Sequence, residues 1–127
     1  MSNFRNLYRC QKCGNIAEII HAGDRTPSCC GEHMTLLEPH EGQEGKEKHI
    51  PIVTTTDSLV SVVVGSIEHP MLAEHYIEWI ELETPKSCQR VFLKPGDQPK
   101  ATFAITSDTE QLVRVYCNIH GLWQTSV

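Results

Sequence analysis

The chain has 127 residues, which corresponds to one ordinary domain or two very small ones. Its apolar fraction of 39% and charged fraction of 21% exclude both a disordered tail and a membrane protein. The formal net charge of −5 argues against a nucleic-acid-binding protein. Because the first residues lack the apolar stretch of a secretory signal, we expect a cytoplasmic protein with neither nucleic-acid nor membrane partners.

Side chains that bind metals are unusually frequent. The chain contains six cysteines and seven histidines. Cytosolic thiols are kept reduced, so cysteines clustered at short spacings in such a protein bind metal more often than they form disulfides. The composition therefore predicts a metalloprotein.

The N-terminal segment, residues 1–37, contains four of the six cysteines. A segment of this size cannot fold on a hydrophobic core alone and needs a metal, a disulfide or a partner chain. The polar residues 38–48, with two glycines and a proline, are typical of a linker or an exposed loop. We therefore expect a small metal-binding domain, a linker and a second domain over residues 49–127.

The second domain has the pattern of short β-strands. Runs rich in Val, Ile, Thr and aromatic residues, separated by turn signals, predict strands at 59–67, 75–83, 90–95, 101–106 and 111–117. There is no helical periodicity over ten or more residues. The pattern predicts an all-β protein whose larger domain is an antiparallel sandwich or barrel.

The first group of candidate ligands is Cys10, Cys13, Cys29 and Cys30. In Cys10-Gln-Lys-Cys13-Gly14 the spacing lets one turn direct both sulfurs at one ion, and the glycine permits a positive φ. The adjacent pair Cys29-Cys30 departs from the usual second Cys-x-x-Cys, and we expect both sulfurs to reach one ion only with distorted angles. The spacing predicts a four-thiolate metal site and leaves open whether the metal is iron or zinc.

The second group is His49, His69, His75, Cys117 and His120. In a small sandwich, residues at these separations can gather at one end, where the loops cluster. Four imidazoles and one thiolate leave one position of an octahedron open, as a catalytic metal requires. The donor types suit iron, zinc or copper. Single histidines elsewhere (His21, His33 and His40) are interpreted as ordinary residues.

With both groups placed, the sequence resembles the desulfoferrodoxins, the two-iron class of superoxide reductase. The resemblance extends over nearly the whole chain and rests on six ordered motifs: Cys10-x-x-Cys13…Cys29-Cys30, Glu47-Lys48-His49-Ile-Pro, His69-Pro70-Met71, Glu74-His75-Tyr-Ile-Glu-Trp-Ile-Glu-Leu, Phe92-Leu-Lys-Pro-Gly and Tyr116-Cys117-Asn-Ile-His120-Gly.

The resemblance implies two iron ions per chain. A desulforedoxin-like domain would bind one through the four N-terminal cysteines. An immunoglobulin-like domain would hold the catalytic iron with the four histidines of the second group in a plane and Cys117 axial. Glu47 would occupy the sixth position in the ferric state, with Lys48 as a positive group beside it. Cys88 lies outside the motifs and is interpreted as an ordinary thiol.

The implied activity is one-electron reduction of superoxide to hydrogen peroxide, in a homodimer re-reduced by rubredoxin or a similar donor. Two alternatives remain at this point. A rubredoxin-like electron carrier explains the four cysteines but does not need the histidines. A zinc-stabilised binding module explains both groups as scaffolding, and it would be colourless, whereas an iron–tetrathiolate protein is coloured.

Overall fold

The computed structural model describes residues 4–41, 49–66, 68–105 and 110–127. These residues form twelve strands and no helix, so the predicted all-β class is confirmed. The chain divides into two compact units, Met1–Glu38 and Pro39–Val127. Within the described ranges, no helix is long and apolar enough to cross a membrane.

The first unit consists of very short strands. β1 (Leu7–Arg9) pairs with β2 (Ile16–Glu18) and β5 (Thr35–Leu36), and β3 (Ser28–Cys29) forms a hairpin with β4 (Glu32–His33). Among the described residues, its buried cluster consists of Tyr8, Cys10 and Met34 with their partly buried neighbours, and Leu7 is also buried. A core this small agrees with the expectation that the unit depends on a bound metal.

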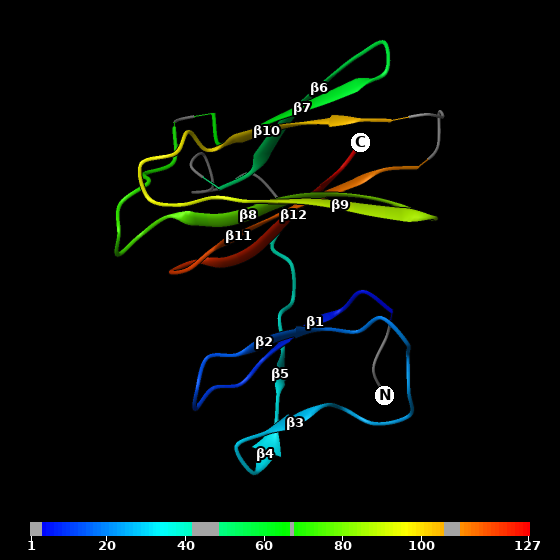
Figure 1. Ribbon diagram of the computed structural model, residues 1–127, viewed down its shortest axis with the longest axis vertical. Coiled ribbons are helices and arrows are strands. Elements are labelled where there is room, and N and C mark those ends of the chain that lie inside the picture. Colours follow the sequence, from blue (N-terminus) through cyan, green and yellow to red (C-terminus); the bar gives the residue numbers. More distant parts are fainter. Residues whose placement is uncertain (1–3, 42–48, 67, 106–109) are drawn as a thin grey trace. The chain divides into compact units, whose positions relative to one another are not determined.

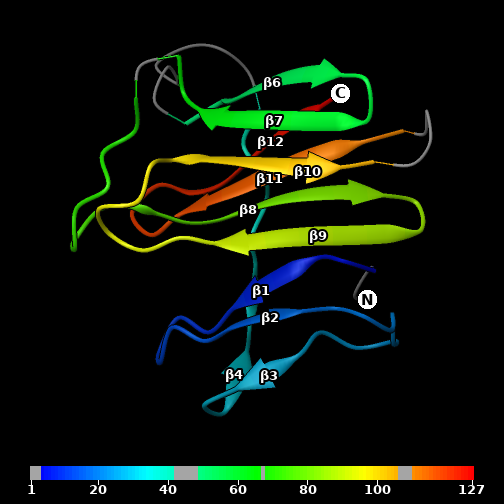
Figure 2. The same ribbon diagram turned by 45° about the horizontal axis from the view of Figure 1, so that its top comes forward.

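The second unit is a two-layered antiparallel sandwich (Figures 1 and 2). One sheet has the order β10-β7-β6 and the other the order β12-β11-β8-β9. The strands are β6 (Pro51–Thr56), β7 (Leu59–Val64), β8 (Ile77–Thr84), β9 (Ser87–Phe92), β10 (Lys100–Ala104), β11 (Leu112–Cys117) and β12 (Gly121–Ser126).

Alternating apolar residues of both sheets form the core of the sandwich. β7 contributes Val60, Val62 and Val64, all fully buried, because every second residue of a strand faces the same side. They pack in one cluster with the fully buried Ile80 of β8 and Val115 of β11. This core ends at the sulfur of Cys117, which is itself 0% exposed.

Five of the seven sandwich strands lie where the sequence predicts strands. The other two, β6 and β12, do not stand out in the sequence. β6 is Pro-Ile-Val-Thr-Thr-Thr, with only its first residue buried, and β12 is Gly-Leu-Trp-Gln-Thr-Ser. Both are at sheet edges, as are β9 and β10, but their longest run of large apolar residues is two, Ile-Val in β6 and Leu-Trp in β12.

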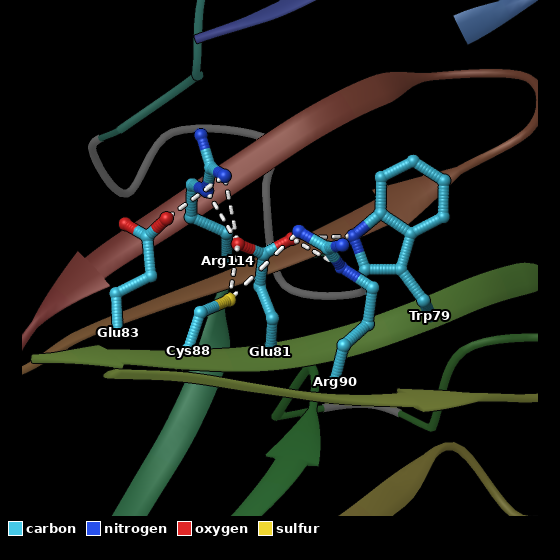
Figure 3. A network of polar contacts seen from close by, with 6 residues as sticks. All are labelled: Trp79, Glu81, Glu83, Cys88, Arg90 and Arg114. Atoms are coloured by element: carbon cyan, nitrogen blue, oxygen red, sulfur yellow. Dashed lines mark hydrogen bonds and ion pairs between the residues drawn. The ribbon is translucent and has the colours of Figure 1, made fainter. Parts of the chain in front are cut away.

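The face of β8 away from the core carries a charged network (Figure 3). The fully buried Glu81 carboxylate accepts hydrogen bonds from Trp79 Nε1 at 2.7 Å, from Arg90 and from Arg114. Arg114 also lies 3.0 Å from Glu83. Two carboxylates and two guanidinium groups balance one another, so these acidic side chains are satisfied within the sheet rather than available to a metal ion.

Candidate metal centres

The first centre begins with a turn that follows β1. The backbone N–H of Gly14 donates to the Cys10 carbonyl at 2.9 Å, and Gly14 has a φ of +84°. The N–H of Cys13 points at the Cys10 sulfur, 3.5 Å away. The turn therefore brings the two sulfurs of the Cys-x-x-Cys motif to the same side, as the spacing predicts.

The adjacent cysteines are brought together by a two-residue hairpin turn between β3 and β4. Cys29 pairs with Glu32, so Cys30 and Gly31 are the two turn residues, with φ of +54° and +79°. Positive φ at both positions is what a type I′ turn requires. A left-handed conformation costs a non-glycine residue about 1–2 kcal/mol, and here it lets consecutive side chains turn to one side instead of alternating.

The four sulfur atoms lie within 4.8 Å of one another. Cys13 Sγ is 3.6 Å from Cys29 Sγ, and Cys29 Sγ is 3.9 Å from Cys30 Sγ. Metal–sulfur bonds of about 2.3 Å at tetrahedral angles separate neighbouring sulfurs by about 3.8 Å. The spacing of these sulfurs therefore fits four thiolates around one ion.

The environment favours negative charge on one sulfur of this group. The N–H of Cys13 and that of Lys12 hold the pKa of Cys10 at about 6. Contacts with the other sulfurs, first of all Cys13, raise the pKa of Cys29 and raise that of Cys30 to about 12. Four thiolates so close together repel, and a bound cation offsets that repulsion.

The second centre lies at one end of the sandwich. His49 precedes β6, while His69 and His75 lie in the connection from β7 to β8. Cys117 ends β11, and His120 is the last residue of the turn to β12. The antiparallel pair Pro51–Val64 places the start of β6 beside the end of β7 in one sheet. The pair Cys117–Ile77 places the end of β11 beside the start of β8 in the other sheet. The two connections lie together at the left in both ribbon views (Figures 1 and 2).

The four imidazole rings are arranged as a square. Neighbouring ring centroids are 4.8 Å apart for His49–His69 and His69–His75, 5.0 Å for His75–His120 and 4.6 Å for His120–His49. The pair His49–His75 is 6.5 Å apart, as the diagonal of a square exceeds its side. His120 Nδ1 lies 3.0 Å from His49 Nε2. Two metal–nitrogen bonds of about 2.1 Å at a right angle separate their nitrogens by about 3 Å, so the spacing fits neighbouring ligands of one ion.

The tautomer of His69 also fits a metal. Its Nδ1 is 2.7 Å from the Pro70 carbonyl oxygen, which can only accept a hydrogen bond, so Nδ1 carries the proton. The lone pair is then on Nε2, the nitrogen free to bind a metal. His69 belongs to a group with His49, His75 and Cys117 in which one donor atom of each residue lies within 4.8 Å of all the others. A backbone carbonyl that fixes the ring of a ligating histidine is common in metal sites.

Cys117 closes the interior side of the square. Its sulfur is fully buried and lies 3.8 Å from His120 Nδ1. Burial raises the pKa of the thiol, and the backbone N–H groups of His120 and Ile119 act in the opposite direction. His69 is also buried (1% exposed), whereas His120 is exposed and His75 is half-buried. The centre therefore has a buried sulfur side and a side that reaches the surface.

Sequence reasoning missed the residues that hold the loops together. Asn118 accepts a hydrogen bond from the N–H of Tyr76 at 2.9 Å, and its amide donates to the Glu74 carbonyl at 3.1 Å. The turn carrying His120 is thus tied to the segment carrying His75. The motif Tyr116-Cys117-Asn118 contained the only signal, an asparagine directly after a ligand candidate.

The remaining candidates are placed as follows. Glu47 and Lys48 lie outside the described residues. Cys88 is exposed on β9, with its sulfur 3.9 Å from Glu81 and Arg90, away from both groups. His40, which the sequence places in a linker, belongs to the second unit and pairs with Trp123 in an isolated bridge.

Comparison with solved structures defines the class of protein. Over 94% of this chain and 95% of the other, the structure is similar to that of the superoxide reductase from Treponema pallidum, with a TM-score of 0.74 and 31% identity. It is also similar to the reduced neelaredoxin-type superoxide reductase of Archaeoglobus fulgidus, with a TM-score of 0.59 and 29% identity over 70% of this chain and 95% of that one. The fold and the two centres thus define an iron-dependent oxidoreductase of the superoxide reductase class.

Sequence comparison gives the family. The profile for desulfoferrodoxin matches residues 41–126, and the profile for the desulfoferrodoxin N-terminal domain matches residues 2–37. A desulfoferrodoxin homologue of Archaeoglobus fulgidus is 49% identical over 98% of this chain and 99% of its own length. The desulfoferrodoxin of Nitratidesulfovibrio vulgaris is 45% identical over 98% of each chain. The chain belongs to the desulfoferrodoxin family, and its two groups of donors fit the two iron centres of that family.

Proposed function

We propose that this chain reduces superoxide by one electron to hydrogen peroxide at the second centre, without dismutation. The observation that carries the proposal is the asymmetry of that centre. Its sulfur is buried in the sandwich core, while His75 and His120 lie toward the surface, where a small anion can approach. A purely structural metal site needs no such exposed side.

Nine residues are proposed to hold the two metals: Cys10, Cys13, Cys29 and Cys30 at the first centre, and His49, His69, His75, His120 and Cys117 at the second. When bound at the second centre, the iron supplies the transferred electron and attracts the superoxide anion. The Cys117 thiolate, on the buried side, would donate electron density to a bound iron and would favour its oxidation. The N–H of His120, 3.5 Å from that sulfur, moderates this donation.

Lys48 and Glu47 are proposed to act beside the exposed side. Lys48 directly precedes the proposed ligand His49 in the sequence, and its ammonium group is proposed to draw an anion toward the centre. Glu47 is proposed to bind the centre only after it has been oxidised. It therefore has no part in capturing the substrate.

The balance of the reaction requires a partner. One superoxide, one electron and two protons give one hydrogen peroxide, so each turnover leaves the centre oxidised by one electron. An external donor, rubredoxin or a similar carrier, is proposed to return that electron. The protein is proposed to act as a homodimer in the cytoplasm.

Metal content and superoxide kinetics together test the proposal. Protein matured with ample iron is expected to carry two irons per chain, and its ferrous form to react with superoxide in pulse radiolysis and yield one peroxide per superoxide consumed. The same chain loaded with zinc is the control and is expected to be colourless and inactive. Zinc in both centres after maturation with ample iron would instead support the zinc-stabilised binding module.

A further inference from the structure

Trp123 contacts two of the proposed ligands of the second centre in two different ways. Its indole stacks on the His49 ring, with centroids 4.8 Å apart and planes inclined by 17°. Its Nε1–H donates to the backbone carbonyl of His120 at 3.1 Å. His49 Nε2 and His120 Nδ1 are the two ring nitrogens that lie 3.0 Å apart. One side chain therefore contacts both residues of this neighbouring pair.

Trp123 is itself fixed in place. It lies on β12 opposite Val115 and is 4% exposed. The exposed His40 ring packs against the indole with centroids 4.6 Å apart and planes inclined by 36°. His40 is held there by two backbone hydrogen bonds to β12, from its N–H to Leu122 and from the N–H of Gln124 to its carbonyl. An indole packed in this way cannot tilt without disturbing the sheet edge.

We propose that Trp123 is a positioning residue that orients His49 and His120 toward the metal, with His40 supporting the indole. The His49 ring rotates about its last torsion angle, which has a broad energy profile. A parallel stack restricts that rotation and keeps Nε2 directed at the centre. The hydrogen bond to the His120 carbonyl restricts the turn that carries the other ligand. The inference rests on the proposed ligand set.

Two substitutions separate the two contacts. Trp123→Phe keeps an aromatic face for His49 but lacks the N–H donor, and Trp123→Leu lacks both. The matched control is Trp79→Phe. Trp79 is the other tryptophan of the chain, 7% exposed, and its Nε1–H also donates, but to Glu81. Its loss removes a buried indole hydrogen bond without touching His49 or His120.

The readout is iron release from each centre of the holoprotein to an excess of a ferrous chelator, without oxygen. Loss of groups that orient metal ligands typically costs about 10–100-fold in metal affinity. We expect release from the second centre to be about tenfold faster in Trp123→Phe and about a hundredfold faster in Trp123→Leu. The first centre is the internal reference, and it is expected to release iron at the wild-type rate in every variant. The visible band of the oxidised second centre should shift in Trp123→Phe and not in Trp79→Phe.

Three results would overturn the inference: wild-type release and an unchanged band in Trp123→Phe, equal acceleration at both centres, or equal acceleration in Trp79→Phe. The last two would show general loosening of the chain. If Trp123→Leu does not fold, Trp123→Phe still decides. A wild-type protein that holds no iron at the second centre would overturn the proposed function itself, a different result from any of these.

Discussion

The two centres of this chain differ in how the fold supplies their ligands. The first takes four sulfurs from two short turns within residues 10–30, and Cys13 and Cys30 are exposed. The second gathers five donors from separate connections between residues 49 and 120, and its sulfur is fully buried. The ligands of the first centre are close together in the sequence and partly exposed, whereas those of the second are brought together by the fold of the sandwich.

This difference predicts different dependence on the metal. In the described part of the first unit, the buried cluster has three residues, one of them the candidate ligand Cys10, so its fold and its metal site are expected to form together. The second unit has a core of eleven buried residues that ends at the sulfur of Cys117. Its ligand frame is thus held mainly by hydrophobic packing. Four sulfurs also fill a tetrahedral site, whereas five mixed donors leave a position for a substrate.

The largest effect is expected from replacing the buried sulfur. Cys117→Ser should abolish superoxide reduction and the visible absorption band of the second centre, because a serine oxygen is a harder and weaker donor to iron. The first centre should keep its own absorption. Pulse radiolysis and the aerobic spectrum measure both quantities on one sample.

Cys88→Ser is the matched control for that substitution. Cys88 is an exposed thiol on β9, outside both groups. We expect it to keep the wild-type rate and both spectra. A Cys117→Ser protein that retained the band and the rate would remove Cys117 from the ligand set.

A substitution at the first centre tests whether the two centres act independently. Cys13→Ser should eliminate the iron of the first centre, because it removes one of four sulfurs from a unit with almost no core. The bimolecular rate of the second centre with superoxide should remain within about twofold of wild type, since its five donors all lie in the sandwich unit. A collapse of that rate would show that the first centre takes part in the chemistry.

The same contrast explains what the sequence could predict. The thiol spacing of Cys10 and Cys13 is a local signal, and the structure reproduces it directly. The way Cys29 and Cys30 avoid divergence was not predictable from spacing, because it depends on the left-handed φ of a two-residue hairpin turn. A type I′ turn is usually predicted from the sequence Asn-Gly, and Cys-Gly is not a typical sequence for it.

At the second centre, residue types indicated the proposed ligands, but the order of the rings around the square could not be predicted. That order follows from how the two sheets pack on each other: His49 precedes β6 of one sheet and His120 precedes β12 of the other, and their ring nitrogens lie 3.0 Å apart. Asn118 and Trp123 were missed for a related reason. Each acts through contacts with other residues, and a single asparagine or tryptophan in a strand or turn predicts no particular partner. The strands β6 and β12 were missed because neither contains a run of more than two large apolar residues.

A smaller effect is expected from the charge beside the second centre. The chain carries −5 overall, so its mean field repels superoxide, and capture needs local positive charge. A unit charge about 6 Å from the anion contributes roughly 0.7 kcal/mol at the dielectric constant of water and about 3 kcal/mol at an effective value of 20. Lys48→Ile should therefore slow the second-order reaction about tenfold.

Ionic strength separates this electrostatic effect from a loss of metal. The rate of Lys48→Ile should depend less steeply on salt than that of the wild type, with both irons still bound. Glu47→Ala is the control and should leave the rate nearly unchanged, because the proposed role of Glu47 follows oxidation. A wild-type rate with a wild-type salt slope in Lys48→Ile would exclude steering by this residue.

The smallest effect is expected at the tie between the two ligand-bearing connections. Asn118→Ala removes the acceptor for the Tyr76 N–H and the donor to the Glu74 carbonyl. Each hydrogen bond contributes about 0.5–1.5 kcal/mol, and water replaces part of it because Asn118 is half-buried. We expect the free energy of unfolding of the second unit to fall by about 1–2 kcal/mol, which is roughly a tenth of the stability of a typical domain. The superoxide rate should fall two- to threefold at most. Asn118→Asp keeps the acceptor for the Tyr76 N–H but places a carboxylate oxygen opposite the Glu74 carbonyl oxygen, so it should destabilise the unit by at least half as much as Asn118→Ala. Chemical denaturation of the holoprotein measures the free energy of unfolding, and pulse radiolysis measures the superoxide rate.

A rate loss in Asn118→Ala as large as that of Lys48→Ile would mean that these two hydrogen bonds fix the centre itself rather than only the loops around it.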